Sequence, residues 1–213
     1  KTTSEKQIAM IGVLEVYAWQ QLVDTFGDIP YTDALKGAEE PTPAYDDDAK
    51  IYADLLVRID AAIAKLNGTG SAYGSADIIF GGDMTHWKKF ANSLIMQLSL
   101  QLSKKYPAAD GYAATEFKSA LANAGGVITT VADEAWFTYT ADFQNPWVAN
   151  RQPDYFLSKE FTDALNGRGT TSNTALDARV NVFARYPTRE GVPYGYKNGS
   201  GTGKTGMSTK IWT

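Results

Sequence analysis

Seven aromatic residues lie close together between positions 136 and 156, and polar residues are interspersed among them. The rings are Trp136, Phe137, Tyr139, Phe143, Trp147, Tyr155 and Phe156. The polar neighbours are Gln144, Asn145, Asn150, Arg151, Gln152 and Asp154. A sugar ring binds between flat apolar faces and amide, guanidinium or carboxylate groups, so this stretch indicates a carbohydrate site. Packing in a hydrophobic core is the alternative for each of these rings.

Trp147 is the ring that we expect to face a ligand. Pro146 precedes it, and Asn145 and Arg151 flank it, which favours an ordered loop that holds the indole at the surface. Asn145 and Arg151 are therefore also candidate ligand contacts.

Three further tyrosines follow in order of preference. Tyr155 is predicted in the first turn of a helix whose apolar stripe does not include it, and the adjacent Asp154 could accept a sugar hydroxyl. Tyr194 and Tyr196 come next, in a glycine-rich tail. All of these positions are predicted to bind ligand, and none is predicted to be catalytic.

The residue types needed for most enzyme chemistry are scarce. The chain has no cysteine and one histidine, which excludes a zinc site of the Cys/His kind, a disulfide framework and a thiol nucleophile. A Ser-His-Asp triad would have to use His86, for which a capping or surface role near Asp83 is the simpler interpretation. We therefore predict that the protein is not an enzyme, with a glycosidase using two loop carboxylates as the alternative.

Two other motifs are interpreted without a cofactor or a metal. Asp46, Asp47 and Asp48 suit the first turn of a helix, where carboxylates complement the helix dipole. The segment 198–205 nearly matches a phosphate-binding loop, but Asn198 stands where glycine is required, and neither a strand before it nor a helix after it is evident. We predict a glycine-rich surface loop there.

Charge argues against nucleic acid as a partner, and hydropathy argues against a membrane-spanning helix. The formal net charge of −4 and the isoelectric point near 5.0 argue against nucleic acid, which requires a concentrated basic surface. The longest apolar run, 8–23, is interrupted by Glu15, Gln20 and Gln21, and it falls short of the ~20 apolar residues of a membrane-spanning helix.

Hydrophobic periodicity predicts a mainly α protein with little β structure. We expect helices near 4–26, 46–66, 83–105, 110–124 and 153–165. The segments 127–131 and 135–140 are β-branched and aromatic, so they are predicted as two short strands or as extended loop segments. We predict one partial domain, 1–213, in which 127–213 is a loop-rich ligand face.

The helix 83–105 is predicted to be central because its apolar residues cover much of its circumference. Its stripe is Trp87, Phe90, Ala91, Leu94, Leu98 and Leu102, widened by Ile95 and Leu100. The helix 46–66 should bury Ile51, Leu55, Ile59, Ile63 and Leu66, and should form a hairpin with the central helix. Helical spacing of Ile11, Leu14, Ala18 and Leu22 marks the first helix.

Several phrases coincide with one family pattern, in the same order and at similar separations. They are Leu22-Val23-Asp24-Thr25-Phe26-Gly27-Asp28-Ile29-Pro30-Tyr31, then Tyr45-Asp46 with Ile51-Tyr52, then 77–83 leading into 87–94. Weaker matches follow at 145–147, 154–158 and 176–180. The chain resembles the SusD/RagB-like outer-membrane nutrient-binding lipoproteins. It departs from them at Gln97 and Gln101, where members often carry arginine, and at Ala178, where proline is common.

The resemblance implies degenerate tetratricopeptide-like helical hairpins with inserted loops. It also implies a non-catalytic surface protein that captures oligosaccharide or peptide and passes it to a TonB-dependent transporter of the SusC-like kind. Members are more than twice as long, so we expect this chain to be a central portion. The lipid anchor to the cell outer membrane would then lie in a segment absent from it.

Two alternatives to glycan capture remain open at this point. The helical hairpins could serve as a scaffold for a partner protein, with the aromatic residues in the core. The ligand of a binding protein could equally be a peptide.

Overall fold

The computed structural model describes residues 4–144, 158–168, 174–180, 188–189 and 192–193. The chain divides into two compact units, 1–138 and 139–213. Helix predominates among the described residues, and strand is confined to four two-residue segments, so the predicted mainly α class is confirmed.

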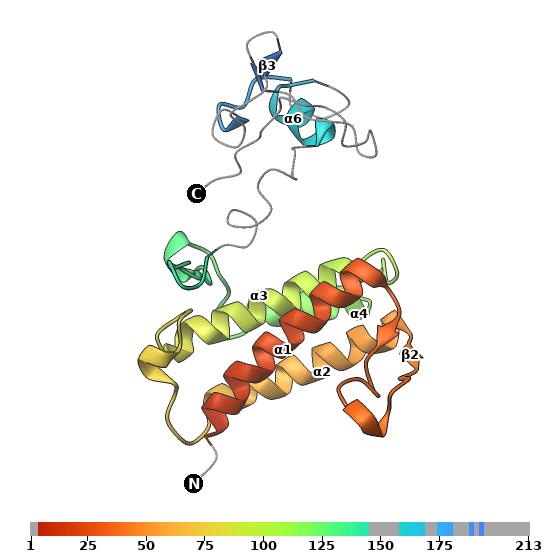
Figure 1. The fold of residues 1–213 in the computed structure, drawn as a ribbon, viewed down its shortest axis with the longest axis vertical. Helices are drawn as coiled ribbons and strands as arrows, with labels where there is room; N and C mark the ends of the chain where they lie inside the picture. Colours follow the sequence, from red (N-terminus) through yellow and green to blue (C-terminus); the bar gives the residue numbers. More distant parts are fainter. Residues whose placement is uncertain (1–3, 145–157, 169–173, 181–187, 190–191, 194–213) are drawn as a thin grey trace. The chain divides into compact units, whose positions relative to one another are not determined.

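The first unit contains four long helices, shown as one packed group in Figure 1. They are α1 (Glu5–Phe26), α2 (Asp48–Leu66), α3 (Met84–Leu102) and α4 (Tyr112–Ala122). The closest pairs are α1 with α2 and α3 with α4, and α2 joins the two pairs by packing on α3. The predicted packing of α2 on α3 is present. It is less extensive than the packing of α1 on α2 or of α3 on α4.

Polar side chains define where three of these helices begin. Ser4 accepts a hydrogen bond from the backbone N–H of Gln7, while Asp47 and Asp83 each accept two from the first turns of α2 and α3. These contacts satisfy donors that a helix start leaves free. The predicted helix starts are thus within two residues of the observed ones, whereas α3 ends three residues before the predicted position 105.

The central helix has the predicted core. Trp87 and Leu94 are 1% and 2% exposed, and the other buried apolar residues of α3 are Ala91, Ile95, Leu98 and Leu102. Leu100 was predicted to widen this face, and that prediction is wrong because the side chain is 64% exposed. It lies two residues after Leu98, which places it on the far side of the helix.

Replacing Leu94 with alanine is expected to lower the free energy of unfolding by about 2 to 5 kcal/mol, because it removes a buried side chain from a packed core. Denaturant melts measure the change, and Leu100→Ala on the same helix is the matched control, expected within about 0.5 kcal/mol of the parent. A loss below about 1 kcal/mol for Leu94→Ala would contradict this assignment of the core.

Helix α1 has apolar residues on two faces. Ala9, Met10, Val13, Val16 and Val23 are buried against the other helices. The residues whose spacing predicted the helix, Ile11, Leu14, Ala18 and Leu22, face the other way and are exposed. With Ile8 and Phe26 they form an apolar stripe, which we call the α1 stripe.

A short antiparallel pairing was missed from the sequence. β1 (Ile29–Pro30) pairs with β2 (Tyr45–Asp46), with Ile29 opposite Asp46. The Asp46 carboxylate accepts hydrogen bonds from the backbone N–H groups of Tyr31 and Thr32, at 3.1 and 2.8 Å. This pairing closes the base of the loop between α1 and α2, which includes the 3-10 turn η1 (Gly37–Glu39).

Two further 3-10 turns precede and follow the α3–α4 pair. They are η2 (Gly74–Ala76) and η3 (Val131–Asp133). Within the predicted segments 127–131 and 135–140 the structure shows no strand, so the extended-loop alternative holds for both, except at Val131, where η3 begins.

One carboxylate organises the turn that leads into α3. Asp77 Oδ2 accepts hydrogen bonds from the indole Nε1 of Trp87 at 2.7 Å and the backbone N–H of Gly82 at 2.8 Å. Its Oδ1 accepts from the backbone N–H groups of Ile79 and Phe80, at 3.0 and 3.2 Å. The turn and the largest core side chain therefore share one buried acceptor.

In the second unit, the described elements are a helix, α6 (Lys159–Leu165), and the paired strands β3 (Thr188–Arg189) and β4 (Val192–Pro193). Ser158 has extended backbone and caps α6 through the N–H of Phe161. The prediction of a single helix over 153–165 is therefore wrong at its start, since α6 begins at Lys159. Residues 153–157 lie outside the described residues. Among the described helices of the whole chain, none is both long and apolar enough to cross a membrane.

Candidate functional site

The described part of the aromatic segment is exposed. Trp136 and Phe143 are 67% and 71% exposed, and Phe137 and Tyr139 are also on the surface. Exposure of this kind contradicts core packing for these four rings, and the two most exposed, Trp136 and Phe143, present their faces to solvent. Trp136 and Phe137 belong to the first unit, and Tyr139 and Phe143 belong to the second.

Asp133 fixes the loop that immediately precedes Trp136. Its carboxylate accepts a hydrogen bond from Lys89 Nζ of α3 at 2.6 Å, and others from the backbone N–H groups of Thr129 and Thr130. The bond to Lys89, followed by the backbone bonds, holds the pKa of Asp133 well below its usual range. His86 lies between Asp83 and this carboxylate, with its Nδ1 3.0 Å from Asp83 Oδ2.

Because the folded state lowers the pKa of Asp133, its stabilising contribution is complete above the ordinary pKa of aspartate and is lost as pH falls below it. We therefore expect the gap in unfolding midpoint between the parent and Asp133→Asn to be widest near neutral pH and to shrink below about pH 4. Glu134→Gln, one residue along, is the control. A gap that does not change with pH would contradict this role for Asp133.

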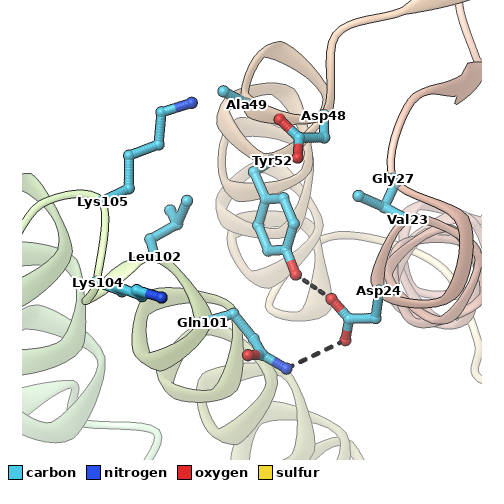
Figure 2. Close-up of a pocket in the computed structure, with 10 residues that line it drawn as sticks. All are labelled: Val23, Asp24, Gly27, Asp48, Ala49, Tyr52, Gln101, Leu102, Lys104 and Lys105. Atoms are coloured by element: carbon cyan, nitrogen blue, oxygen red, sulfur yellow. Dashed lines mark hydrogen bonds between the residues drawn. The ribbon is translucent and has the colours of Figure 1, made fainter.

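A cavity of about 470 Å³ lies where α1, α2 and the end of α3 meet, and we call it the Asp24 cavity. Figure 2 shows Asp24 at its wall, where one carboxylate oxygen accepts a hydrogen bond from the Tyr52 hydroxyl. The other oxygen accepts from Gln101 Nε2 at 3.4 Å, and from Gln20 Nε2 at the same distance. Three helices are thus joined at one carboxylate.

The electrostatics of this cavity favour binding over proton transfer. Burial, then the hydrogen bond to Asp24, raises the pKa of Tyr52, so its hydroxyl stays protonated. Asp24 already accepts three hydrogen bonds, which leaves it poorly placed as a general base. Lys104 and Lys105 also line the cavity, so it suits a small polar molecule.

The described residues offer no group of three or more His, Asp or Glu side chains placed to hold a metal ion. Asp46 binds the backbone of the β1–β2 connection and Asp47 caps α2. The prediction that all three aspartates lie at the first turn of this helix is therefore wrong for Asp46, which is in β2, and is confirmed for Asp47 and Asp48.

The sequence-predicted ligand residues all lie outside the described residues. They are Asn145, Trp147, Arg151, Asp154, Tyr155, Tyr194 and Tyr196. The glycine-rich segment 198–205 lies outside them too. Their roles stay predictions.

The structure adds Asp24, Tyr52 and Gln101, which the sequence reasoning did not assign to a site. Asp24 and Tyr52 are 28 positions apart and occur in phrases that carry the family resemblance. Gln101 is one of the positions where the chain departs from the family pattern. The resemblance at Asp24 and Tyr52 and the departure at Gln101 are the sequence features that could have pointed to this cavity.

Comparison with known families decides the relationship. Residues 1–210 match the SusD-like family model described as starch-binding and associating with the outer membrane. The chain belongs to the SusD-like family. No curated protein matches it significantly.

Solved structures agree with this assignment. A chitin-binding SusD homologue from Flavobacterium johnsoniae is 27% identical with a TM-score of 0.63, over 74% of this chain and 33% of that one. A SusD homologue from Bacteroides uniformis is 26% identical with a TM-score of 0.59, over 75% of this chain and 31% of that one. A third, from Bacteroides vulgatus, is 22% identical with a TM-score of 0.69, over 94% and 41%, and supports the fold alone. The matched part of this SusD-like chain thus corresponds to about a third of the first two relatives' length.

Proposed function

We propose that this chain is part of a non-catalytic outer-membrane protein that captures oligosaccharides and passes them to a TonB-dependent transporter of the SusC-like kind. The match of residues 1–210 to a starch-binding, outer-membrane-associated family carries the proposal. The chitin-binding relative adds a second glycan class. Attachment through a lipid anchor outside residues 1–213 belongs to the same proposal.

Exposed aromatic residues support a glycan as the ligand. Trp136 and Phe143 present apolar rings to solvent, and the predicted ligand residues Trp147 and Tyr155 follow in the same stretch. Stacking of a sugar on such rings requires no cofactor and no ionised nucleophile. A glycan can therefore bind at such rings without any catalytic group.

One observation favours a second function, which is docking of a partner protein. The α1 stripe exposes Ile8, Ile11, Leu14, Leu22 and Phe26 along one helix. Contiguous apolar surface of this kind is typical of interaction sites. This scaffold role is compatible with glycan binding because the stripe and the aromatic segment involve different residues.

Isothermal titration of the chain with N-acetylchitohexaose, maltoheptaose and a pool of tryptic peptides tests the proposal. We expect saturable binding of at least one oligosaccharide and no release of reducing ends on prolonged incubation. Binding of the peptides alone would replace glycan with peptide as the ligand class. Release of reducing ends would show a glycosidase and overturn the non-catalytic assignment.

A further inference from the structure

A second cavity, of about 600 Å³, lies between α1, the segment that follows β1, and α2. We call it the Trp19 cavity. Its volume falls within the range of roughly 300 to 1,000 Å³ that is usual for small-molecule sites. It shares no lining residue with the Asp24 cavity.

Two aromatic rings form a corner in this cavity. The centroids of Trp19 and Tyr31 are 4.8 Å apart and their planes meet at 79°. Both side chains are half-buried, so each ring is supported by the core on one side while it lines the cavity on another. An apolar corner of this kind can receive the C–H face of a sugar ring.

Hydrogen bonds hold the Tyr31 ring in place before any ligand arrives. Its backbone N–H donates to Asp46, and its hydroxyl donates to Asp54 and accepts from Arg58 Nη1 at 2.7 Å. Burial and the bond to Asp54 raise the pKa of Tyr31 to about 12, so the hydroxyl stays protonated at neutral pH. A ring fixed in this way loses little freedom when a ligand binds.

The charged groups that line the cavity nearly cancel, with three acidic groups (Glu15, Asp46 and Asp54) and two basic ones (Lys50 and Arg58). Arg58 Nη2 forms an ion pair with Glu15 Oε2 at 2.7 Å, and the Asp46 and Asp54 carboxylates accept hydrogen bonds from Tyr31. Because all three carboxylates already have partners within the protein, the cavity has no strong preference for an ion. Hydrogen-bonding groups beside an aromatic corner suit a neutral polyhydroxylated molecule.

Leu35 at the cavity's edge is unusual in two respects. It is 91% exposed, and among the described residues it is the non-glycine with a positive φ, at 65°. A leucine rarely adopts this conformation, and strained backbone of this kind clusters at ligand sites. A ligand in the cavity would cover part of its side chain.

We propose that the Trp19 cavity binds one ring of a neutral oligosaccharide, with its apolar face in the Trp19–Tyr31 corner and its hydroxyls on Asp54 and Lys50. The inference rests on the proposed glycan-binding function and adds a second sugar site to it. A purely structural brace between α1 and α2 is the competing interpretation. It would explain the Glu15–Arg58 pair, but it assigns no role to the open corner or to Leu35.

Fluorine NMR of the chain labelled with 5-fluorotryptophan tests this site and the Trp147 site in one titration. Trp19→Phe and Trp147→Phe assign the two resonances among the five tryptophans. Titration with N-acetylchitohexaose and, separately, maltoheptaose should shift the Trp19 resonance saturably. Asp54→Ala should weaken that response at least about tenfold, since it removes a charged hydrogen-bonding partner.

Asp60→Ala, on the same helix but outside the cavity lining, is the matched control and should leave the response unchanged. A Trp147 shift without a Trp19 shift would overturn this inference and leave the proposed function intact. A Trp19 shift alone would support this site and remove Trp147 from the proposed one. If neither resonance moved with either glycan, both proposals would be overturned. An Asp54→Ala variant that melts earlier but keeps the full Trp19 response would support the brace.

Discussion

Replacing Asp77 with alanine is expected to lower the free energy of unfolding by about 3 to 5 kcal/mol, because four donors lose their shared acceptor. One donor is the indole of Trp87, which is 1% exposed, and the others are backbone N–H groups of the turn into α3. Water cannot easily replace the carboxylate at the buried indole. The measurement is a denaturant melt followed by tryptophan fluorescence.

Two variants separate this effect from simple helix capping. Asp83→Ala removes the exposed N-cap of α3, six residues away, and should cost about 1 kcal/mol. Asp77→Asn keeps one acceptor oxygen and should fall between the two. If Asp77→Ala cost no more than Asp83→Ala, the buried carboxylate would not be the organiser of this turn.

Asp77 also gives the stability a defined dependence on pH. Its hydrogen bonds to Trp87 and to three backbone N–H groups outweigh the effect of burial, and the pKa of Asp77 is lowered. The stabilisation is therefore present above the ordinary pKa of aspartate and is lost as pH falls through the lower folded value. Asp133, which binds Lys89 in the second turn of α3, acts in the same direction, so acid should loosen both loops that pack against the N-terminal part of α3.

Local signals were enough to predict the helices of the first unit. Asp47 and Asp83 cap α2 and α3, and apolar spacing marks the faces that contain Leu55 and Leu94. The orientation of α1 could not be predicted in the same way, because it carries apolar residues on two faces. Only tertiary packing shows that Val13 is buried and Ile11 exposed.

The two cavities were beyond the reach of sequence spacing. Asp24 meets Tyr52 and Gln101 only because three helices converge, and Tyr31 meets Arg58 only because the β1–β2 pairing folds its segment onto α2. Separations of this length leave no periodic signal. The aromatic segment, in contrast, was visible from composition alone, because its rings are close in the chain.

Replacing Trp147 with alanine is expected to weaken oligosaccharide binding about five- to 150-fold, because stacking on an aromatic ring is worth roughly 1 to 3 kcal/mol for other flat ligands. The proline before Trp147 and the polar residues around it predict an ordered surface loop. A surface indole contributes little to the core, so the thermal midpoint should stay nearly unchanged. Calorimetric titration with N-acetylchitohexaose or maltoheptaose measures the loss of binding.

Phe26→Ala provides the matched control, since it also removes an exposed aromatic ring, 69% exposed at the end of α1, without touching the aromatic segment. It should leave glycan affinity unchanged. Intact binding in Trp147→Ala would exclude this indole as the stacking surface. Failure of the same variant to fold would place Trp147 in a core, and the exposed rings of Trp136 and Phe143 would then become the strongest remaining candidates for the sugar contact.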